Sequence, residues 1–407
     1  MKIICFKCKE KMLKKILSES EKVILILESI DETVPYSNET LEKLYKIYRI
    51  NSIDSIEELV AVYQDILNEK DNYDKVFAGE EHAVLAVGFF YSLLKKDFKY
   101  LELAIGTRDK RAMKEHFKNA NLDFAKFKSS YSLEELKAGI GHGLTYPIVA
   151  KPACGMGSYN TEVLYNSKQL EKYFLNLNLN QVLHSDQIVL EEYIDGKEYH
   201  ADMLWKNGEC IFLSIFQDLV PRIEVMKKVN RNGAFLVRKE LNPILYQEIE
   251  KKHISLINEL KYFDGIMHTE FFVKDGKIYF SEIAKRNGGG AIVQAINVAF
   301  GIDLIEEWLN IELGKKLNLN IKHPSKIYCR LNFSPLKAEG IIKYVPTKED
   351  YLSFPWIKHV EIFIKEGQKY SHSTAYIKSI YLVIEAEDEE DLIKKIDEVY
   401  EKYPIVI

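Results

Sequence analysis

Two glutamates in neighbouring predicted strands are the residues of this sequence whose type and spacing point most directly to chemistry. Glu270 lies in a predicted strand at 265–273, Glu282 lies in a second predicted strand at 277–284, and a tight Asp-Gly turn joins the two. Cross-strand pairing would bring the carboxylates together, which is unfavourable unless a cation lies between them. Magnesium suits such a pair, because it takes one or two carboxylates together with phosphate oxygens and water. Each glutamate considered alone could equally be a solvated strand residue.

Arg286 follows the second glutamate by four residues. From that position a guanidinium group could contact a phosphoryl group in transfer, or an acyl phosphate, through paired hydrogen bonds. His268 stands two residues before Glu270 and is either a functional side chain or a packed strand histidine. Three further arginines could pair with substrate carboxylates or simply face solvent: Arg222, Arg231 and Arg238.

A loop of small residues follows a predicted strand at 146–151, whose last residue is Lys151. It reads Gly-Met-Gly-Ser over residues 155–158. Glycines allow backbone N–H groups to approach a phosphate closely, Ser158 adds a donor, and the lysine supplies a point charge. The spacing matches neither a Walker A loop nor a dinucleotide fingerprint, and glycine-rich turns are common. The loop alone therefore leaves a plain structural turn open.

The segment EEYIDGKEY, residues 191–199, has the pattern of a strand end that turns sharply and returns. Predicted strands at 187–193 and 198–205 flank its Asp-Gly turn, which favours a hairpin. Such a turn can present backbone groups to the edge of an adenine, and Glu198 could accept hydrogen bonds from ribose hydroxyls. The segment alone could equally be an acidic hairpin on a solvated face.

Short apolar runs alternate with helical patterns over the first hundred residues, which predicts a small parallel sheet with helices on its faces. Strands are expected at 2–6, 23–27 and 75–78. The 407 residues exceed what one hydrophobic core normally supports, so several units are expected. We predict an α/β fold in four parts: a Rossmann-like domain at 1–105, a unit with the glycine-rich loop at 106–200, a unit with the two glutamates at 201–314 and a carboxyl-terminal α+β unit at 315–407.

Composition excludes several classes of protein. The formal net charge is -5, so there is no overall basic field of the kind that binds nucleic acid. No run reaches the roughly 20 apolar residues that a membrane-spanning helix needs. The five cysteines are odd in number and scattered, which argues against a disulfide framework and favours a reducing compartment, the cytoplasm. Cys5 and Cys8 form a C-x-x-C without a second pair at zinc-ribbon spacing, so we expect two ordinary thiols.

The order of these parts resembles the ATP-grasp superfamily over nearly all of the chain. Five motifs occur in the family's order: Asp109-Lys110 with Met113-Lys114, Lys151-Pro152 with the glycine-serine loop, EEYIDGKEY, Gly265-x-x-His268-x-Glu270, and Glu282-Ile283-x-x-Arg286-x-Gly288-Gly289. The resemblance implies an ATP-grasp fold that uses ATP and Mg²⁺, with Mn²⁺ as an alternative metal.

The resemblance also implies a role for each matching position. Lys110 and Lys151 resemble the two phosphate-binding lysines, and Ser158 resembles the tip of the loop that closes over the triphosphate. The other implied roles are adenine binding by Glu191 and the backbone at Tyr193 and Ile194, ribose binding by Glu198, metal binding by Glu270 and Glu282, and stabilisation of the acyl phosphate by Arg286.

One position departs from the family pattern. Many members carry a metal-binding Asn two residues after the second glutamate, where this chain has Ala284, so the detailed metal geometry is open and Asn287 is a candidate substitute. Arg286 is retained, which is similar to the amino-acid ligase branch that makes dipeptides. In that branch a histidine near the position of His268 can contact the reacting carboxylate.

The resemblance implies a carboxylate–amine ligase, in which ATP phosphorylates a carboxylate, expected to be that of an amino acid, and an amine displaces the phosphate. A ligase that loads an amino acid onto the thiol of a carrier protein would share the first step. A non-catalytic nucleotide-binding protein is the rival from another class. The expected partners are small-molecule carboxylate and amine substrates, with neither nucleic acid nor membrane, and a homodimer would be unsurprising for the fold.

Overall fold

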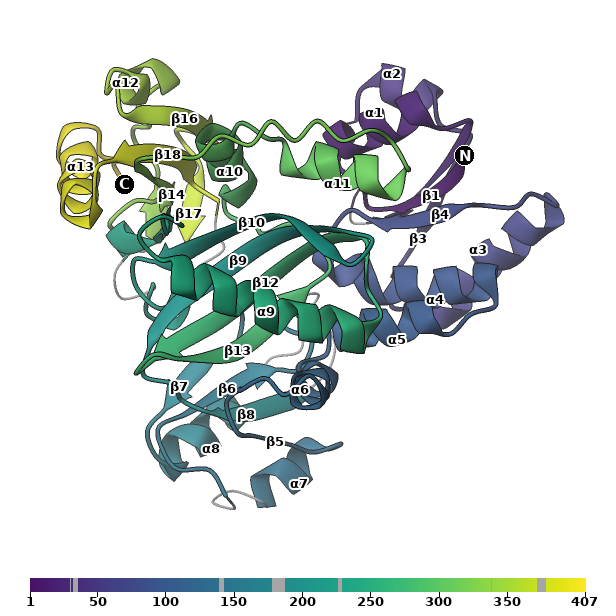
Figure 1. The fold of residues 1–407 in the computed structure, drawn as a ribbon, viewed down its shortest axis with the longest axis horizontal. Coiled ribbons are helices and arrows are strands. Elements are labelled where there is room, and N and C mark those ends of the chain that lie inside the picture. The colour runs from purple at the N-terminus through teal and green to yellow at the C-terminus, as the bar shows by residue number, and fades with distance from the viewer. Residues whose placement is uncertain are drawn as a thin grey trace.

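Helices and strands are mixed along the whole chain, so the predicted α/β class is confirmed (Figure 1). The structure is a computed structural model that describes residues 1–407 except 30, 32–35, 139–142, 178–186, 226–228, 338 and 372–377. Within the described residues, no helix combines the length and the apolar character that crossing a membrane requires.

A four-stranded parallel sheet forms the amino-terminal part, in the order β3-β2-β1-β4. One of its two inner strands, β1, is Lys2–Phe6, as predicted, and this strand is buried from Ile3 onward. Parallel sheets are apolar in this way because helices cover both faces. The other elements here are α1 (Glu10–Glu19), β2 (Lys22–Glu28), α2 (Asn38–Glu42), β3 (Lys46–Ile50), α3 (Ile56–Asn68), β4 (Lys75–Ala78), η2 (Glu81–Ala83), α4 (Val84–Lys95) and α5 (Lys99–Gly106).

A second four-stranded sheet is antiparallel, in the order β5-β8-β6-β7, and we call it the small sheet. Strands β6 (Ile148–Pro152) and β7 (Glu162–Leu164) form an antiparallel hairpin around the glycine-rich loop. The remaining elements of this region are α6 (Lys110–Asn119), β5 (Phe127–Ser129), α7 (Leu133–Ala138), α8 (Ser167–Leu175) and β8 (Ile188–Glu192).

An eight-stranded antiparallel sheet, the large sheet, has the order β13-β12-β9-β10-β11-β14-β18-β16. It is one continuous sheet on both sides of residue 314, where the sequence suggested a boundary between units. The elements from β9 to the carboxyl terminus are β9 (Lys197–Lys206), β10 (Glu209–Asp218), η3 (Arg222–Glu224), η4 (Val229–Arg231), β11 (Gly233–Leu236), α9 (Pro243–Leu260), β12 (Gly265–Lys274), β13 (Lys277–Ala284), α10 (Ile292–Phe300), α11 (Leu304–Glu312), β14 (Ile327–Phe333), β15 (Glu339–Ile341), α12 (Lys348–Leu352), β16 (Ile357–Ile362), β17 (Lys369–Ser371), β18 (Ile380–Ala386) and α13 (Glu389–Lys402).

The predicted hairpin around Asp195 and Gly196 is wrong. Strand β8 pairs with β5 and β6 in the small sheet, whereas β9 pairs with β10 and β12 in the large sheet. The Asp-Gly turn therefore carries the chain from one sheet to the other. A strand pattern does not specify the partner strand, because pairing depends on packing against residues far away in the sequence.

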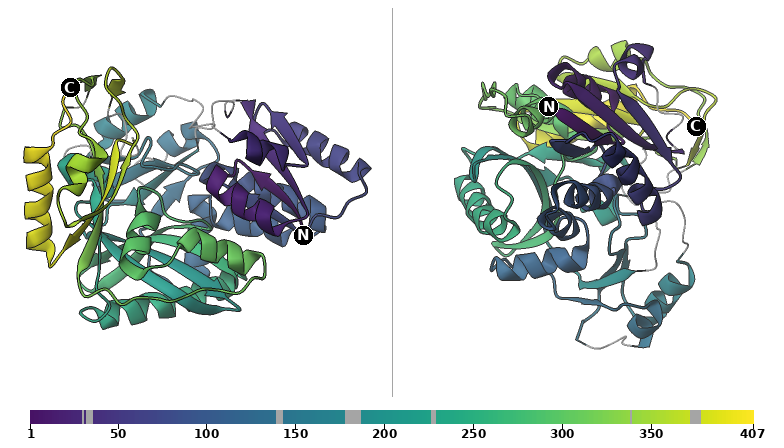
Figure 2. Two further views of the ribbon diagram at one scale, coloured as in Figure 1. Left: turned by 90° about the horizontal axis from the view of Figure 1, so that it is seen from above. Right: turned by 90° about the vertical axis from the view of Figure 1, so that its right-hand side faces the viewer.

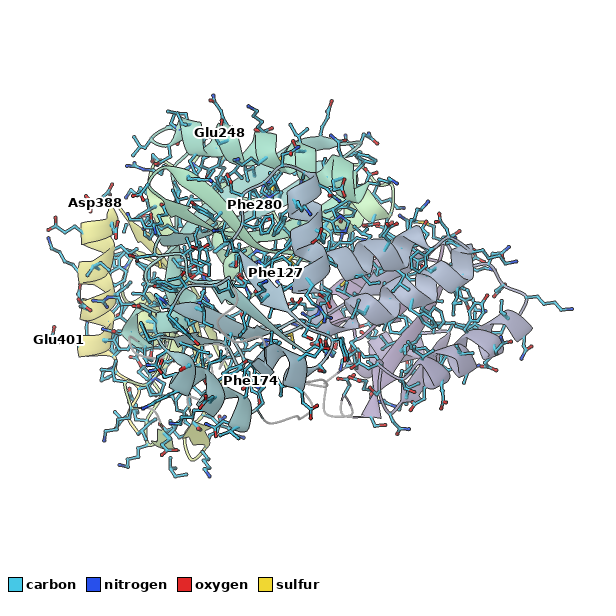
Figure 3. All side chains as sticks on the ribbon, turned by 90° about the horizontal axis from the view of Figure 1, so that it is seen from below. Phe127, Phe174, Glu248, Phe280, Asp388 and Glu401 are labelled. Carbon is cyan, nitrogen blue, oxygen red and sulfur yellow. The ribbon has the colours of Figure 1, made fainter. Side chains whose placement is uncertain are left out.

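Aromatic side chains join the two sheets. Phe117 of α6 lies with its ring centroid 6.2 Å from that of Phe124 and 5.5 Å from that of Phe280 on β13. Phe127 of the small sheet continues this contact at 6.4 Å from Phe124 (Figure 3). The packing of α6 thus fixes how the two sheets face each other.

Helix α9 covers one face of the large sheet, while α13 and the amino-terminal sheet lie at opposite ends of the molecule (Figure 2).

Candidate active site

A cleft of about 1100 Å³, counting the solvent at its mouth, lies between the small sheet and the large sheet. The catalytic, nucleotide-binding and metal-binding residues implied by the resemblance lie in separate segments of the sequence, and the fold brings all of them except His268 to this cleft. Asn287, the candidate substitute metal ligand, is not among the residues that line it. Its lining includes Lys110, Lys151, Ser158, Glu191, Tyr193, Ile194, Glu198, Glu270, Glu282 and Arg286.

Glu270 and Glu282 are direct cross-strand partners, which confirms the predicted pairing. Both side chains are partly open to the cleft, with exposed fractions of 35% and 27%. The position of Glu270 inside the protein would raise its pKa, but His268, whose Nε2 lies 3.6 Å from the carboxylate, outweighs this and holds the pKa well below its usual value. Two carboxylates that open into one cleft are a donor set that suits magnesium.

Two lysines lie beside Glu282. Lys110 Nζ is 3.2 Å from one of its carboxylate oxygens, and Lys151 Nζ is 3.4 Å from the other. Lys151 also pairs with Glu191 at 3.1 Å. Burial would lower the pKa of Lys151, but Glu191 and Glu282 outweigh burial and raise the pKa above its ordinary value. The Lys151 ammonium group is therefore charged, and phosphate oxygens that enter the cleft would meet two cations next to the glutamate pair.

Helix α6 positions a third lysine behind the first two. Asp109 caps the helix by accepting a hydrogen bond from the Arg111 N–H at 2.8 Å, and Lys114 follows Lys110 by one helical turn on the same face. Lys114 is wholly buried, and its Nζ lies 3.0 Å from Glu191. Burial would raise the pKa of Glu191, but its two lysine neighbours hold that pKa below the usual value. Glu191 therefore anchors two lysines with one carboxylate.

The glycine-rich loop is held in place by the cations that flank it. The carbonyl oxygen of Gly155 accepts hydrogen bonds from Arg108 Nη1 at 3.0 Å and from Lys110 Nζ at 2.9 Å. Gly157 has a φ of 64° and Ser158 a φ of 56°, both in the left-handed region, which glycine adopts without steric cost. The lysine expected to bind phosphate thus also fixes the loop expected to close over it.

Glu198 lies at the start of β9, where it is 7% exposed and accepts a hydrogen bond from the backbone N–H of Arg222 at 2.7 Å. Burial, together with the neighbouring Asp218 and Glu270, raises the pKa of Glu198 to about 8. A protonated carboxyl group can donate as well as accept, which suits it to ribose hydroxyls. The cleft also has flat and apolar lining that suits an adenine ring: Val149, Phe272 and Phe280.

Residues 144–295, which include the glycine-rich loop and both glutamates, match the family model of the ATP-grasp domain. Residues 144–295 are therefore assigned to an ATP-grasp domain.

Whole-chain similarities agree with this assignment. The chain is similar to the L-arginine-specific L-amino acid ligase of Bacillus subtilis, with 28% identity over 324 residues that cover 78% of this chain and 76% of that protein. It has the fold of the L-amino acid ligase from Bacillus licheniformis, with a TM-score of 0.75 at 18% identity over 100% of this chain and 98% of that one. The biotin carboxylase domain dimer of Hydrogenobacter thermophilus 2-oxoglutarate carboxylase, a complex with ADP, MgADP and bicarbonate, gives a TM-score of 0.67 at 18% identity over 99% of this chain and 90% of that one. The chain therefore shares the fold of these two solved structures over its whole length.

Glu81 also lines the ATP-grasp cleft, although no sequence motif indicated a role for it. Its carboxylate accepts hydrogen bonds from Arg286 Nε at 2.9 Å and Nη2 at 2.5 Å, and Arg108 lies 3.6 Å away. Burial would raise the pKa of Glu81, but Arg286 and Arg108 hold it below the usual value. Glu81 follows strand β4, and side chains at the carboxyl ends of parallel strands commonly serve ligand sites, so its position was the available signal.

His268 lies in a second pocket of about 530 Å³, which adjoins the ATP-grasp cleft and shares Glu270 and Arg222 with it. We call it the polar pocket. Of the three arginines that could pair with substrate carboxylates, Arg222 alone lines these two cavities. Arg231 instead pairs with Asp397 at 2.8 Å, and Arg238 donates to the carbonyl of Ser325. Beyond the shared residues, polar side chains dominate the lining of the polar pocket: His200, Asp218, Asn232, Arg330, Asn332 and Tyr381.

Proposed function

We propose that this protein is an ATP-dependent ligase that activates the carboxylate of an amino acid as an acyl phosphate and joins it to an amine. The single observation that carries the proposal is the convergence of Glu270, Glu282, Lys110, Lys151 and Arg286 on one cleft of an ATP-grasp domain. The similarity to the L-arginine-specific ligase of Bacillus subtilis supports an amino acid as the substrate.

In the first step, a carboxylate oxygen of the substrate attacks the γ-phosphorus of ATP, the bond from that phosphorus to the bridging oxygen breaks, and ADP leaves. Lys110 and Lys151 bind phosphate oxygens and neutralise their charge. A magnesium ion held by Glu270 and Glu282 would supply further charge neutralisation on the transferring group. The substrate enters from the polar pocket, because that pocket meets the cleft at Glu270.

In the second step, the nitrogen of a neutral amine attacks the acyl carbon and loses a proton, and the bond to the phosphate oxygen breaks. Arg286 stabilises the negative charge of the tetrahedral intermediate and of the departing phosphate through its guanidinium group. Closure of the glycine-rich loop keeps water from hydrolysing the acyl phosphate before the amine arrives.

A pairwise screen of L-amino acids tests the proposal. ADP and phosphate release should depend on both a carboxylate and an amine, and mass spectrometry should detect the condensed product. L-arginine is the first substrate to test, given the specificity in the name of the Bacillus subtilis relative. ADP release at one rate with every amino acid and with none would reject the proposal.

We also propose a reducing compartment, the cytoplasm, and a homodimer. All five cysteines are free thiols, and Cys5, Cys8 and Cys329 are buried, which suits a protein that needs no disulfide. The solved biotin carboxylase neighbour is a domain dimer. Sedimentation of the purified chain tests the oligomeric state.

A further inference from the structure

The polar pocket and the metal-site glutamates lie on one face of the large sheet. Cross-strand partners share a face, and Glu270 is the partner of both Glu282 on β13 and His200 on β9. A molecule in the polar pocket could therefore reach the metal site with one end while the rest of it lies next to His200.

A buried carboxylate fixes the orientation of two histidines in this pocket. Asp202 Oδ2 lies 2.8 Å from His200 Nδ1, and its Oδ1 lies 2.9 Å from His268 Nδ1. Burial would raise the pKa of Asp202, but the two histidines outweigh burial and hold it well below its usual value. An ionised carboxylate only accepts hydrogen bonds, so both rings must donate from Nδ1. Gly288 covers this group closely, because a Cβ there would come within 2.8 Å of His268 Nδ1.

The surroundings of the second ring nitrogen, Nε2, differ between His200 and His268. His268 Nε2 faces Glu270 at 3.6 Å, and although burial would lower the pKa of His268, Asp202 outweighs burial and raises it to about 9. His200 is 3% exposed, stacks on Phe216 with ring centroids 5.1 Å apart, and its Nε2 has no hydrogen-bond partner among the described residues. Burial lowers the pKa of His200, so this ring is neutral and Nε2 carries a lone pair. A buried acceptor without a donor is costly, which points to a ligand that supplies one.

We propose that His200 Nε2 accepts a hydrogen bond from the α-ammonium group of the amino acid whose carboxylate is activated, and so selects α-amino acids over other carboxylic acids. The inference rests on the proposed function. The carboxylate of the substrate must reach the phosphoryl group beside Glu270, and its ammonium nitrogen is two bonds from the carboxyl carbon. His200, the cross-strand partner of Glu270, is the next side chain on that face of the sheet. Asp202 is a positioning residue, because it sets the tautomer of His200.

A matched pair of variants tests this role. In His200→Asn the amide reaches only to the position of Nδ1, so the bond to Asp202 is kept and the acceptor facing the pocket is lost. In His200→Gln the longer side chain places an amide oxygen near the position of Nε2, so an acceptor is kept. We expect His200→Asn to lower kcat/KM for the α-amino acid about 10- to 100-fold, the usual effect of losing a hydrogen bond to a charged group.

His200→Asn should leave kcat/KM for the matching α-hydroxy acid and the KM for ATP nearly unchanged. His200→Gln should recover part of the kcat/KM that His200→Asn loses with the α-amino acid. ATP affinity and the unfolding midpoint check that the variants are folded. The inference is overturned if the wild-type protein uses the hydroxy acid as well as the amino acid, if His200→Asn lowers both rates equally, or if the purified protein holds one equivalent of zinc. Zinc binding is a competing role for this group, because the possible ligand atoms of His200, Asp202 and His268 lie within 4.8 Å of one another.

Calorimetry separates this inference from the proposed function. If no amino acid stimulates ADP release by the wild-type protein, the proposed function fails. In the presence of ADP and magnesium, weaker binding of an α-amino acid to His200→Asn than to the wild-type protein would still support the inference. Equal binding to both proteins, or no binding to either, would overturn it.

Discussion

Arg286 is bound by Glu81, a residue 205 positions earlier in the chain, through hydrogen bonds of 2.9 and 2.5 Å to one carboxylate oxygen. The arginine follows strand β13 of the large sheet, and the glutamate follows strand β4 of the amino-terminal sheet. The amino-terminal sheet therefore contributes to the site by holding the side chain that we expect to meet the acyl phosphate.

Glu81→Gln should lower kcat about 10- to 100-fold, because Arg286 loses a charged partner in a partly buried position. The KM for ATP should change little, since the proposed phosphate contacts of Lys110 and Lys151 remain. Steady-state kinetics of ADP release measures both. Glu80→Gln is the control, because Glu80 is the adjacent residue but 38% of its side chain is exposed. Wild-type kcat in Glu81→Gln would contradict a contribution of this pair to turnover.

Glu282→Ala should reduce turnover at least about 100-fold and leave the fold intact, since electrostatic groups at a reacting centre contribute this much. The protein should still fold, because Lys110 keeps its bond to the Gly155 carbonyl and Lys151 keeps Glu191. Turnover and the unfolding midpoint are the two measurements. Glu248→Ala, on the exposed face of α9, is the matched control (Figure 3). Full activity in Glu282→Ala would show that this carboxylate does not hold the metal.

The strands that carry the site were predictable because they obey local rules. The Asp-Gly turn between β12 and β13 sets the register of the hairpin as far as Phe271, and a β-bulge then shifts it by one residue so that Glu270 pairs with Glu282. The Asp109 cap likewise marks the start of α6 and so places Lys110 at its first turn.

Contacts between distant segments were not predictable in this way. The strands on either side of Asp195 looked like a hairpin, yet they enter different sheets, and it is this divergence that opens the cleft. Glu81 and His200 carry no motif of their own; each becomes part of a cavity only when separate strands are placed side by side. Residue type and spacing therefore indicated the metal and phosphate groups but not the side chains that orient them.

The protein should be less stable in mild acid than at neutral pH, because His253 is buried in its neutral form. His253 is wholly buried, and Nδ1 must donate to the Ile249 carbonyl at 2.7 Å, so the lone pair of Nε2 accepts from the Thr269 hydroxyl at 2.9 Å. Burial lowers the pKa of His253 to about 4. The unfolded chain binds a proton below its ordinary pKa of about 6.5, whereas the folded chain does so only near pH 4, so stability falls as the pH drops through this window.

The expected loss from this histidine between pH 7 and pH 4 is on the order of 3 kcal/mol. Urea unfolding at several pH values measures it, with His253→Gln as the comparison because carboxylates also titrate in this range. The free energy of unfolding should fall less steeply with pH in His253→Gln than in the wild-type protein. Parallel pH profiles for the two proteins would contradict the assignment.

Gly157→Ala tests whether the shape of the glycine-rich loop matters for ATP. Gly157 has a φ of 64°, and a left-handed conformation costs a residue with a Cβ about 1 to 2 kcal/mol. Gly276, in the β12–β13 turn, has a φ of 76° and open space where a Cβ would lie, so Gly276→Ala carries the same backbone cost outside the cleft. Both variants should lose similar stability, but only Gly157→Ala should raise the KM for ATP, by about 5-fold or more. Equal KM values for the two variants would mean that the loop does not bind the nucleotide.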